Sequence, residues 1–219
     1  MKELYLTSEN LTVKTKKYLN YLNKYFNINK IQFHPDKAAL LILDIQKYFI
    51  DDKSHAFVPS VKTILPGLKK LCQLCKSKNI PLIFTRHLNN FENAGMMNKW
   101  WKDLISDDDR SSITKELSEY TDIVITKTQY DAFYNTNLDS ILKNYGIQQV
   151  IIGGVLTHLC CETTARSAFV RGYEVFFLID GTATYNETFH MNTLYNLSHG
   201  FAKPTTITDI EQTLSEFSK

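Results

Sequence analysis

Short apolar runs recur along the chain from residue 38 onward. Runs of this length are typical of parallel strands that helices cover on both faces. Polar and apolar positions with helical spacing separate most of them, near residues 66–77, 137–144, 158–171 and 188–201, with Pro66 expected in the first turn of its helix. The alternation predicts an α/β fold with a parallel sheet between two layers of helices. The expected strands are AALLILD (38–44), IPLIFTR (80–86), DIVITK (122–127), QQVIIGG (148–154), YEVFFLID (173–180) and PTTIT (204–208).

Residues 1–36 precede this alternation and are predicted to form an N-terminal helical appendage to a domain of residues 37–219. The segment TSENLTVKTKKYLNYLNKYF begins with cap residues and then places Leu11, Tyr18, Leu22 and Tyr25 at helical spacing. We expect this helix to pack on the main domain or on a partner subunit.

Composition narrows the class of protein. The chain has 219 residues, of which 43% are hydrophobic, and this suits one domain with a full core. The net charge of +2 gives no field that would attract nucleic acid or a membrane, so neither is an expected partner. No apolar run has the length of a membrane span and no signal peptide is recognised, so we expect a cytoplasmic location. Four cysteines are too few for a disulfide framework, and reduced thiols are expected.

Chemically active residues follow several of the predicted strands. Ligands and catalytic groups gather at the carboxyl ends of parallel strands, so an acid (Asp44), an ammonium (Lys127) and a thiol (Cys160) would meet at one edge of the sheet. A lysine and a helix N-terminus favour the thiolate, and a carboxylate takes and returns its proton. Each residue alone has a structural interpretation, as a cap or as a small buried side chain.

Three segments, ALLILDIQKYF, TKTQYDAFYNTNLDSIL and VIIGGVLTHLCCETTARSAFVRGYEVFFLIDGTAT, resemble the isochorismatase-like superfamily of cysteine hydrolases. The resemblance extends over about residues 37–210. It implies a three-layer α/β/α, Rossmann-like fold with a six-stranded parallel sheet. It also implies a catalytic triad, in which Asp44 is the general base and acid, Lys127 stabilises the charged groups and Cys160 is the nucleophile.

The resemblance carries further implications for the turn before the nucleophile. A cis peptide is expected between Val155 and Leu156, and the backbone amides of Leu156 and Cys160 are expected to form an oxyanion hole. Cys161 lies one step further round the helix, so it is expected to pack in the core. Members of the superfamily commonly assemble as homo-oligomers, and a dimer or tetramer is expected here.

Nicotinamidases are similar to this chain but carry a metal site, with a D-W-H-P-x-x-H run after the second strand. The corresponding segment here is TRHLNNFENAG, which keeps His87 and lacks the partner histidines. The six histidines of the chain show no ligand spacing on one element. We therefore expect no metal and no other cofactor.

Three functions remain open. Cys160 favours attack on a small amide or ureide through a thioester intermediate. Isochorismatases, which hydrolyse a vinyl ether and release pyruvate, resemble the chain at Tyr130, Phe133 and His158, but typically have glycine at the position of Cys160. The third possibility is a non-catalytic domain that serves binding or assembly, against which the complete triad argues.

Candidate substrate contacts come from the strand ends and from a long loop over residues 87–110. Trp100 and Trp101 form either an aromatic wall of the pocket or part of an amphipathic helix with one tryptophan in the core or at a subunit contact. Arg86 is a candidate for binding a substrate carboxylate, or it pairs with a loop acid. The remaining candidates are Tyr130, Phe133 and His158.

Overall fold

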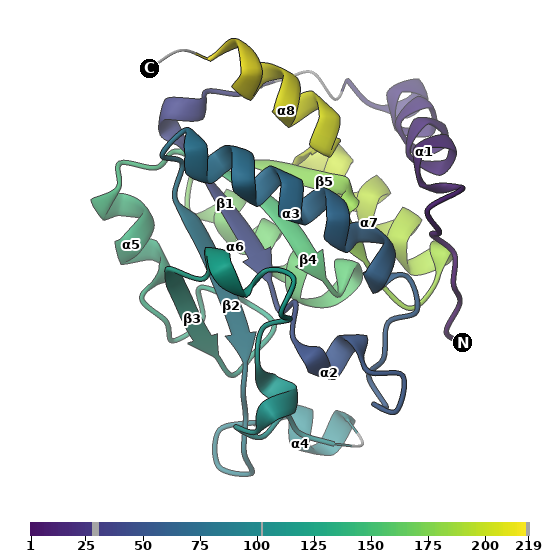
Figure 1. Ribbon diagram of the computed structural model, residues 1–219, viewed down its shortest axis with the longest axis vertical. Coiled ribbons are helices and arrows are strands. Elements are labelled where there is room, and N and C mark those ends of the chain that lie inside the picture. The colour runs from purple at the N-terminus through teal and green to yellow at the C-terminus, as the bar shows by residue number, and fades with distance from the viewer. Residues whose placement is uncertain (28–30, 102, 218–219) are drawn as a thin grey trace.

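The computed structural model describes residues 1–27, 31–101 and 103–217. Its centre is a six-stranded sheet in the order β3-β2-β1-β4-β5-β6, in which all neighbouring strands are parallel (Figure 1). The predicted α/β fold with a six-stranded parallel sheet is confirmed. The strands are β1 (Ala38–Leu43), β2 (Leu82–His87), β3 (Ile123–Lys127), β4 (Gln149–Val155), β5 (Glu174–Ala183) and β6 (Lys203–Thr205).

Helices cover the sheet and make it the middle layer. Figure 1 shows α3 (Val61–Ser77) and α8 (Ile207–Glu216) in front of the sheet, and α6 (Glu162–Val170) and α7 (Glu187–Gly200) behind it. Every residue of β1 and of β4 is buried, as the continuous apolar runs require. Short helices α2 (Lys47–Ile50), α4 (Met97–Trp100) and α5 (Leu138–Asn144) lie in the connections.

Helix α3 begins before the predicted position. It starts at Val61, so Pro66 lies inside the helix and the expectation of a proline in its first turn is wrong. Val61, Ile64 and Leu65 are all buried and extend the apolar face of the helix by more than one turn. Their burial outweighs the one backbone hydrogen bond that a proline removes.

The predicted strand over residues 204–208 is shorter than expected, and a helix that the sequence analysis did not predict follows it. Strand β6 ends at Thr205, and Thr206 begins α8 with a reciprocal cap. The Thr206 hydroxyl accepts a hydrogen bond from the backbone N–H of Asp209, and the Asp209 carboxylate accepts one from the N–H of Thr206. Ile207, Ile210 and Leu214 then bury the inner face of the helix.

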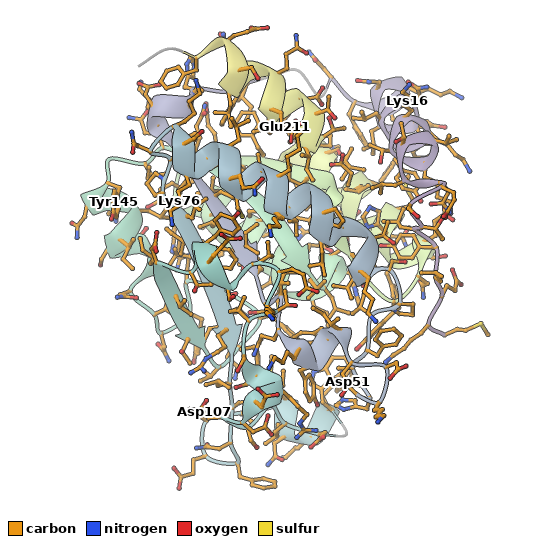
Figure 2. The ribbon with its side chains drawn as sticks, in the orientation of Figure 1. Lys16, Asp51, Lys76, Asp107, Tyr145 and Glu211 are labelled. Atoms are coloured by element: carbon orange, nitrogen blue, oxygen red, sulfur yellow. The ribbon has the colours of Figure 1, made fainter. Side chains whose placement is uncertain are left out.

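The N-terminal helix α1 (Leu11–Tyr25) packs on the main domain, which is one of the two expected arrangements. Tyr18 and Leu22 belong to the same hydrophobic core as the sheet. Lys14 Nζ and the Tyr18 hydroxyl bind the Glu187 carboxylate of α7 at 2.5 and 2.8 Å. The outer face of α1 carries charged side chains such as Lys16 (Figure 2).

None of the helices in the described parts of the chain combines the length and the apolar character that a membrane crossing requires.

Replacement of Leu22 by alanine tests whether α1 is part of the cooperative fold. Leu22 is completely buried, so Leu22→Ala is expected to lower the free energy of unfolding by about 2–5 kcal/mol. Urea denaturation followed by circular dichroism measures this change. The control is Val13→Ala on the same helix, where the side chain is 69% exposed and a change below about 0.5 kcal/mol is expected. Equal effects of the two substitutions would contradict the packing of α1.

Candidate active site

Asp44 follows directly on β1 and is completely buried. Its backbone has a φ of 51°, in the left-handed region that few residues other than glycine, asparagine and aspartate adopt. Thr85 of β2 holds this conformation from two sides. Its hydroxyl accepts a hydrogen bond from the N–H of Asp44 at 3.1 Å and donates one to Oδ1 of the same residue at 2.6 Å. The carboxylate is therefore fixed at the carboxyl end of the sheet.

Gly154 permits the close approach of β4 to the end of β1. A Cβ atom at this position would lie 2.1 Å from the carbonyl oxygen of Leu43, and the residue has a φ of 117°. Both the space and the backbone conformation therefore require glycine. Because Leu43 precedes Asp44, this contact brings the turn after β4 beside the carboxylate.

Lys127 ends β3 and joins the acid to the thiol. Its Nζ atom lies 2.8 Å from Oδ2 of Asp44, 2.9 Å from the carbonyl oxygen of Gln129 and 3.3 Å from Sγ of Cys160. The side chains of Asp44 and Lys127 are both completely buried. The structure thus brings together the three residues that the sequence analysis nominated from separate strand ends.

Cys160 lies in a π-helical turn of residues 157–161 that leads from β4 into α6. The peptide bond between Val155 and Leu156, just before this turn, is cis, as the family resemblance implied. Cys161 is completely buried within the hydrophobic core, in agreement with its expected packing role.

The protonation states of Asp44, Lys127 and Cys160 follow from their burial and from their charges on one another. Burial disfavours the charged form of Asp44, but the Lys127 ammonium, together with weaker contributions from the other neighbours, outweighs this and holds the pKa of the carboxyl below its usual range. Burial also disfavours the charged form of Lys127, but the carboxylate and the sulfur together hold its pKa above the usual range. Burial, reinforced by the Asp44 charge, raises the pKa of Cys160 to about 12. The resting site therefore holds a carboxylate, an ammonium and a neutral thiol, and the expected activation of the thiol by Lys127 does not offset burial.

His87, at the end of β2, completes the surroundings of the ammonium. Its Nδ1 atom lies 3.2 Å from Nζ of Lys127, and its Nε2 atom lies 3.0 Å from Nδ2 of Asn89. Burial, with a further contribution from Lys127, lowers the pKa of His87 to about 3. The imidazole is therefore neutral, with a neighbour at each ring nitrogen.

Asp44, His87 and Cys160 are the one group in the described ranges with the donors and spacing of a metal site, since their ligand atoms lie within 4.8 Å of one another. Lys127 Nζ lies 2.8, 3.2 and 3.3 Å from these same three side chains. The ammonium thus occupies the position that a bound cation would take, and both imidazole nitrogens already have neighbours. This group does not fit a metal ion.

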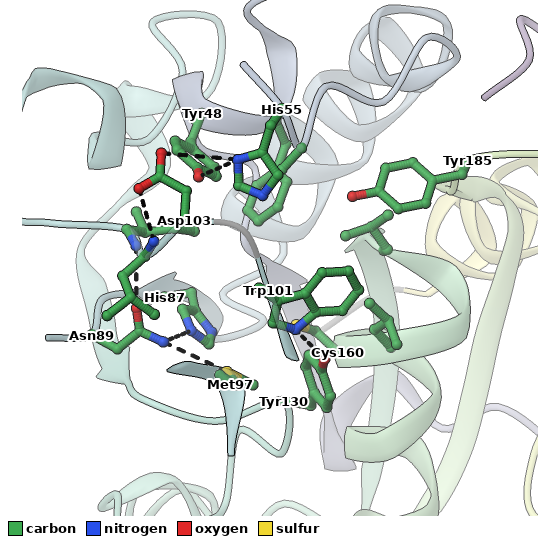
Figure 3. Close-up of a pocket in the computed structure, with 16 residues that line it drawn as sticks. Tyr48, His55, His87, Asn89, Met97, Trp101, Asp103, Tyr130, Cys160 and Tyr185 are labelled. Atoms are coloured by element: carbon green, nitrogen blue, oxygen red, sulfur yellow. Dashed lines mark hydrogen bonds and ion pairs between the residues drawn. The ribbon is translucent and has the colours of Figure 1, made fainter. Parts of the chain in front are cut away.

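A cavity that is open to solvent lies above the thiol. Its walls include the aromatic side chains of Tyr48, Phe49, Trp101, Tyr130 and Tyr185. Figure 3 shows Tyr48, His55 and Asp103 at one end of the cavity, and Trp101, Tyr130 and Cys160 at the other. Of the described residues that line it, none is lysine or arginine, and Asp103 is the only acid.

Two of the predicted substrate contacts line this cavity. Trp101 and Tyr130 are joined by a hydrogen bond of 2.6 Å from the indole Nε1 to the phenol oxygen, and both face the thiol (Figure 3). Trp100 does not line the cavity and is 75% exposed, because the short helix α4 turns it outward. The two adjacent tryptophans therefore have different surroundings.

The other three predicted substrate contacts lie outside the cavity, each with a partner that accounts for its position. Arg86 pairs with the loop acid Asp107 at 3.3 Å. His158 stacks on Phe189 with ring centroids 4.3 Å apart. Phe133 is buried and stacks on Tyr173 with ring centroids 6.0 Å apart.

Sequence reasoning missed several residues of the site. Thr85 shares one face of β2 with His87, so the two-residue period of a strand was a usable signal for it. Asn89 and Tyr185 come from irregular segments, where no periodicity indicates the direction of a side chain.

Comparisons with known proteins agree with this geometry. The model of the isochorismatase domain family matches residues 38–209. Nicotinamidase 3 of Arabidopsis thaliana is 39% identical over 171 residues, which cover 75% of this chain and 82% of that protein. Enterobactin synthase component B of Escherichia coli K12 is 31% identical over 76% of this chain, and the match spans only 60% of that longer protein.

A cysteine hydrolase from Pseudomonas syringae pv. phaseolicola has the same fold. It superposes with a TM-score of 0.80 at 23% identity, over 85% of this chain and 96% of that chain. The chain belongs to the isochorismatase-like hydrolase family. It is a hydrolase of that family, as the sequence resemblance implied.

The protonated state of the resting thiol has a measurable consequence. Because the pKa of Cys160 is raised to about 12, the thiolate fraction is expected to increase about tenfold per pH unit, without a plateau, between pH 6 and 10. The rate of alkylation by iodoacetamide, followed by mass spectrometry of the Cys160 peptide, measures this. Cys160→Ala identifies the background from the other cysteines. A plateau near neutral pH would instead indicate a stable thiolate–ammonium pair.

Proposed function

We propose that this protein hydrolyses the C–N bond of a small, uncharged aromatic carboxamide, with Cys160 as the nucleophile. The observation that carries the proposal is Lys127 Nζ, which lies 2.8 Å from the Asp44 carboxylate and 3.3 Å from Cys160 Sγ at the base of an aromatic cavity. The nicotinamidase relative, 39% identical, supports amide chemistry.

In the first half of the reaction, Asp44 takes the thiol proton as Cys160 Sγ attacks the amide carbonyl carbon. The tetrahedral intermediate carries its negative charge on the former carbonyl oxygen, which the backbone N–H groups of Leu156 and Cys160 bind. Asp44 then returns the proton to the leaving nitrogen. The C–N bond breaks, the amine or ammonia departs, and a thioester to Cys160 remains.

In the second half, water attacks the thioester and Asp44 accepts one of its protons. The C–S bond breaks, the sulfur recovers a proton, and the carboxylic acid leaves. Lys127 stays protonated throughout and stabilises whichever neighbour is negative, the carboxylate at rest or the thiolate during attack. One water is consumed for each amide, and Asp44, Lys127 and Cys160 return to their starting states.

The side chains that line the cavity support an uncharged aromatic carboxamide as the substrate. Trp101, Tyr130 and Tyr185 offer aromatic faces to a flat ring. Asp103 adds negative charge to the wall, which opposes an anionic substrate. Arg86, the arginine expected to bind a carboxylate, pairs instead with Asp107, and Arg166 pairs with Glu162.

The alternatives are less well supported. A vinyl ether that releases pyruvate carries a carboxylate, for which the described lining residues provide no cationic partner. A non-catalytic domain would have no need for a completely buried Asp44–Lys127 pair, which is costly to keep unless it serves chemistry or specificity.

Replacement of each adjacent cysteine tests the proposal. Cys160→Ala is expected to reduce amide hydrolysis by at least about 10⁴-fold, because the nucleophile is lost. Cys161→Ala is expected to keep its activity at a lower stability, since Cys161 lies in the core. Ammonia release from nicotinamide, benzamide and a ureide measures activity, and intact-mass analysis detects an acyl adduct on the wild type.

Isochorismate serves as the competing substrate in the same assays. Pyruvate release that persists in Cys160→Ala, with no adduct on the wild type, would contradict thioester chemistry and favour vinyl-ether hydrolysis.

The family resemblance further supports assembly as a homo-oligomer, either a dimer or a tetramer. Phe91, Met96 and Trp100, all more than 60% exposed in the loop beside the cavity, offer apolar surface for such a contact. Light scattering on the purified protein is expected to give a mass of at least twice the 25.3 kDa of one chain. A monomeric mass would contradict this assembly.

A further inference from the structure

Residues 1–6 lie outside the segment that matches the family, residues 38–209, yet they reach the active site. Tyr5 and Leu6 are 4% and 1% exposed and belong to the core of the main domain. The segment contacts the surroundings of the cavity at two separate places, one behind the nucleophile and one at the rim.

The first contact leads to the turn that carries Cys160. The Tyr5 hydroxyl accepts a hydrogen bond from the N–H of Thr184 at 3.1 Å, so its own hydrogen is available for His190 Nδ1 at 3.0 Å. The same Nδ1 atom lies 3.2 Å from the hydroxyl of Thr157. Thr157 begins the turn of residues 157–161, three residues before the nucleophile. A buried chain of three side chains thus joins the N-terminal segment to this turn.

The chain has little freedom to rearrange. His190 and Thr157 are completely buried, so loss of one member leaves a polar atom without water to replace it. Burial lowers the pKa of His190 to about 4, which keeps the imidazole neutral. The N-terminal segment therefore supplies one of the two hydroxyls that meet at this ring nitrogen, and the other belongs to the turn that carries Cys160.

The second contact is at the rim of the cavity. The backbone N–H of Glu3 donates to the carbonyl oxygen of Tyr185 at 2.7 Å. The Lys2 ammonium lies 4.7 Å from the centre of the Tyr185 ring and donates a hydrogen bond to the backbone carbonyl of His55. Tyr185 and His55 both line the cavity, so Lys2 joins two parts of its wall.

We propose that residues 1–6 are a functional part of the active site, in which Tyr5 positions the turn that carries Cys160 and Lys2 positions the cavity wall at Tyr185 and His55. This inference rests on the proposed role of Cys160 as the nucleophile. Neither residue touches the reacting atoms, so both are positioning residues. Their effects are expected to separate, with Tyr5 acting on the chemical step and Lys2 on substrate binding.

The substitution Tyr5→Phe keeps the ring and removes the hydroxyl. We expect kcat to fall about tenfold with KM within about twofold, because a small displacement of the nucleophile affects the reaction more than binding. The matched control is Tyr173→Phe, which removes an equivalent hydroxyl, bonded to Asp139 at 2.9 Å, outside the lining of the cavity. The control is expected to leave kcat and KM unchanged, and thermal unfolding shows whether the two variants lose comparable stability.

A second readout is independent of any substrate. The alkylation rate of Cys160 by iodoacetamide at pH 8 is expected to differ at least about threefold between Tyr5→Phe and the wild type, with no change in Tyr173→Phe. An unchanged alkylation rate in Tyr5→Phe would overturn the role of Tyr5. If the wild type alkylates but hydrolyses no amide, the proposed function fails while this comparison still decides the positioning role.

The substitution Lys2→Met tests the rim and does not depend on how well Tyr5→Phe folds. It keeps a long side chain and removes the charge, so KM for the preferred amide is expected to rise about threefold at constant kcat. Lys16→Met, on the exposed face of α1 (Figure 2), is the matched control and is expected to change neither parameter. A KM for Lys2→Met equal to that of Lys16→Met would overturn the role of Lys2.

Discussion

The ion pair between Asp44 and Lys127 is the interaction on which the rest of the site depends. Both side chains are completely buried, and two charges removed from water cost several kcal/mol each unless close partners compensate them. Thr85 donates a hydrogen bond to Oδ1 of the carboxylate, and the ammonium forms an ion pair with Oδ2. The carboxylate, a backbone carbonyl and the sulfur satisfy the ammonium. The left-handed conformation of Asp44 and the missing side chain at Gly154 place the carboxylate within reach of these partners.

This pair also determines the state of its neighbours. Because the two charges largely cancel, His87 and Cys160 remain neutral beside them. Burial is the main cause in both cases, since it lowers the pKa of His87 and raises that of Cys160. In the proposed mechanism, the thiolate is therefore generated only when Asp44 accepts the thiol proton during attack. The thiol is therefore protonated and unreactive at rest. Its reactivity depends on the geometry of the turn that carries it, because no thiolate is present before attack.

Much of the fold and the centre of the site could be predicted from the sequence, because both follow from local patterns and one topological rule. The strands were recognised by their continuous apolar runs, and a parallel sheet collects Asp44, Lys127 and Cys160 at one edge. The start of α3 and the existence of α8 could not be predicted in this way. In α3 tertiary burial overrides a proline, and in α8 a cap at Thr206 ends the strand early.

The two tryptophans of the loop show most clearly what the sequence alone does not predict. Trp101 faces inward because Tyr130, distant in sequence, accepts its indole hydrogen, and nothing in the local sequence distinguishes it from Trp100.

The mutual neutralisation of the buried charges has a consequence for how a substrate arrives. Long-range attraction accelerates the encounter only when a site presents a net field to the solvent. Here the ammonium and the carboxylate form a closed dipole, and the uncharged amide that we propose as the substrate carries no net charge for a field to act on. Collisions are therefore guided by the shape of the opening alone. Capture by such a site should be nearly insensitive to ionic strength, and selection among amides then takes place through contact and desolvation inside the cavity.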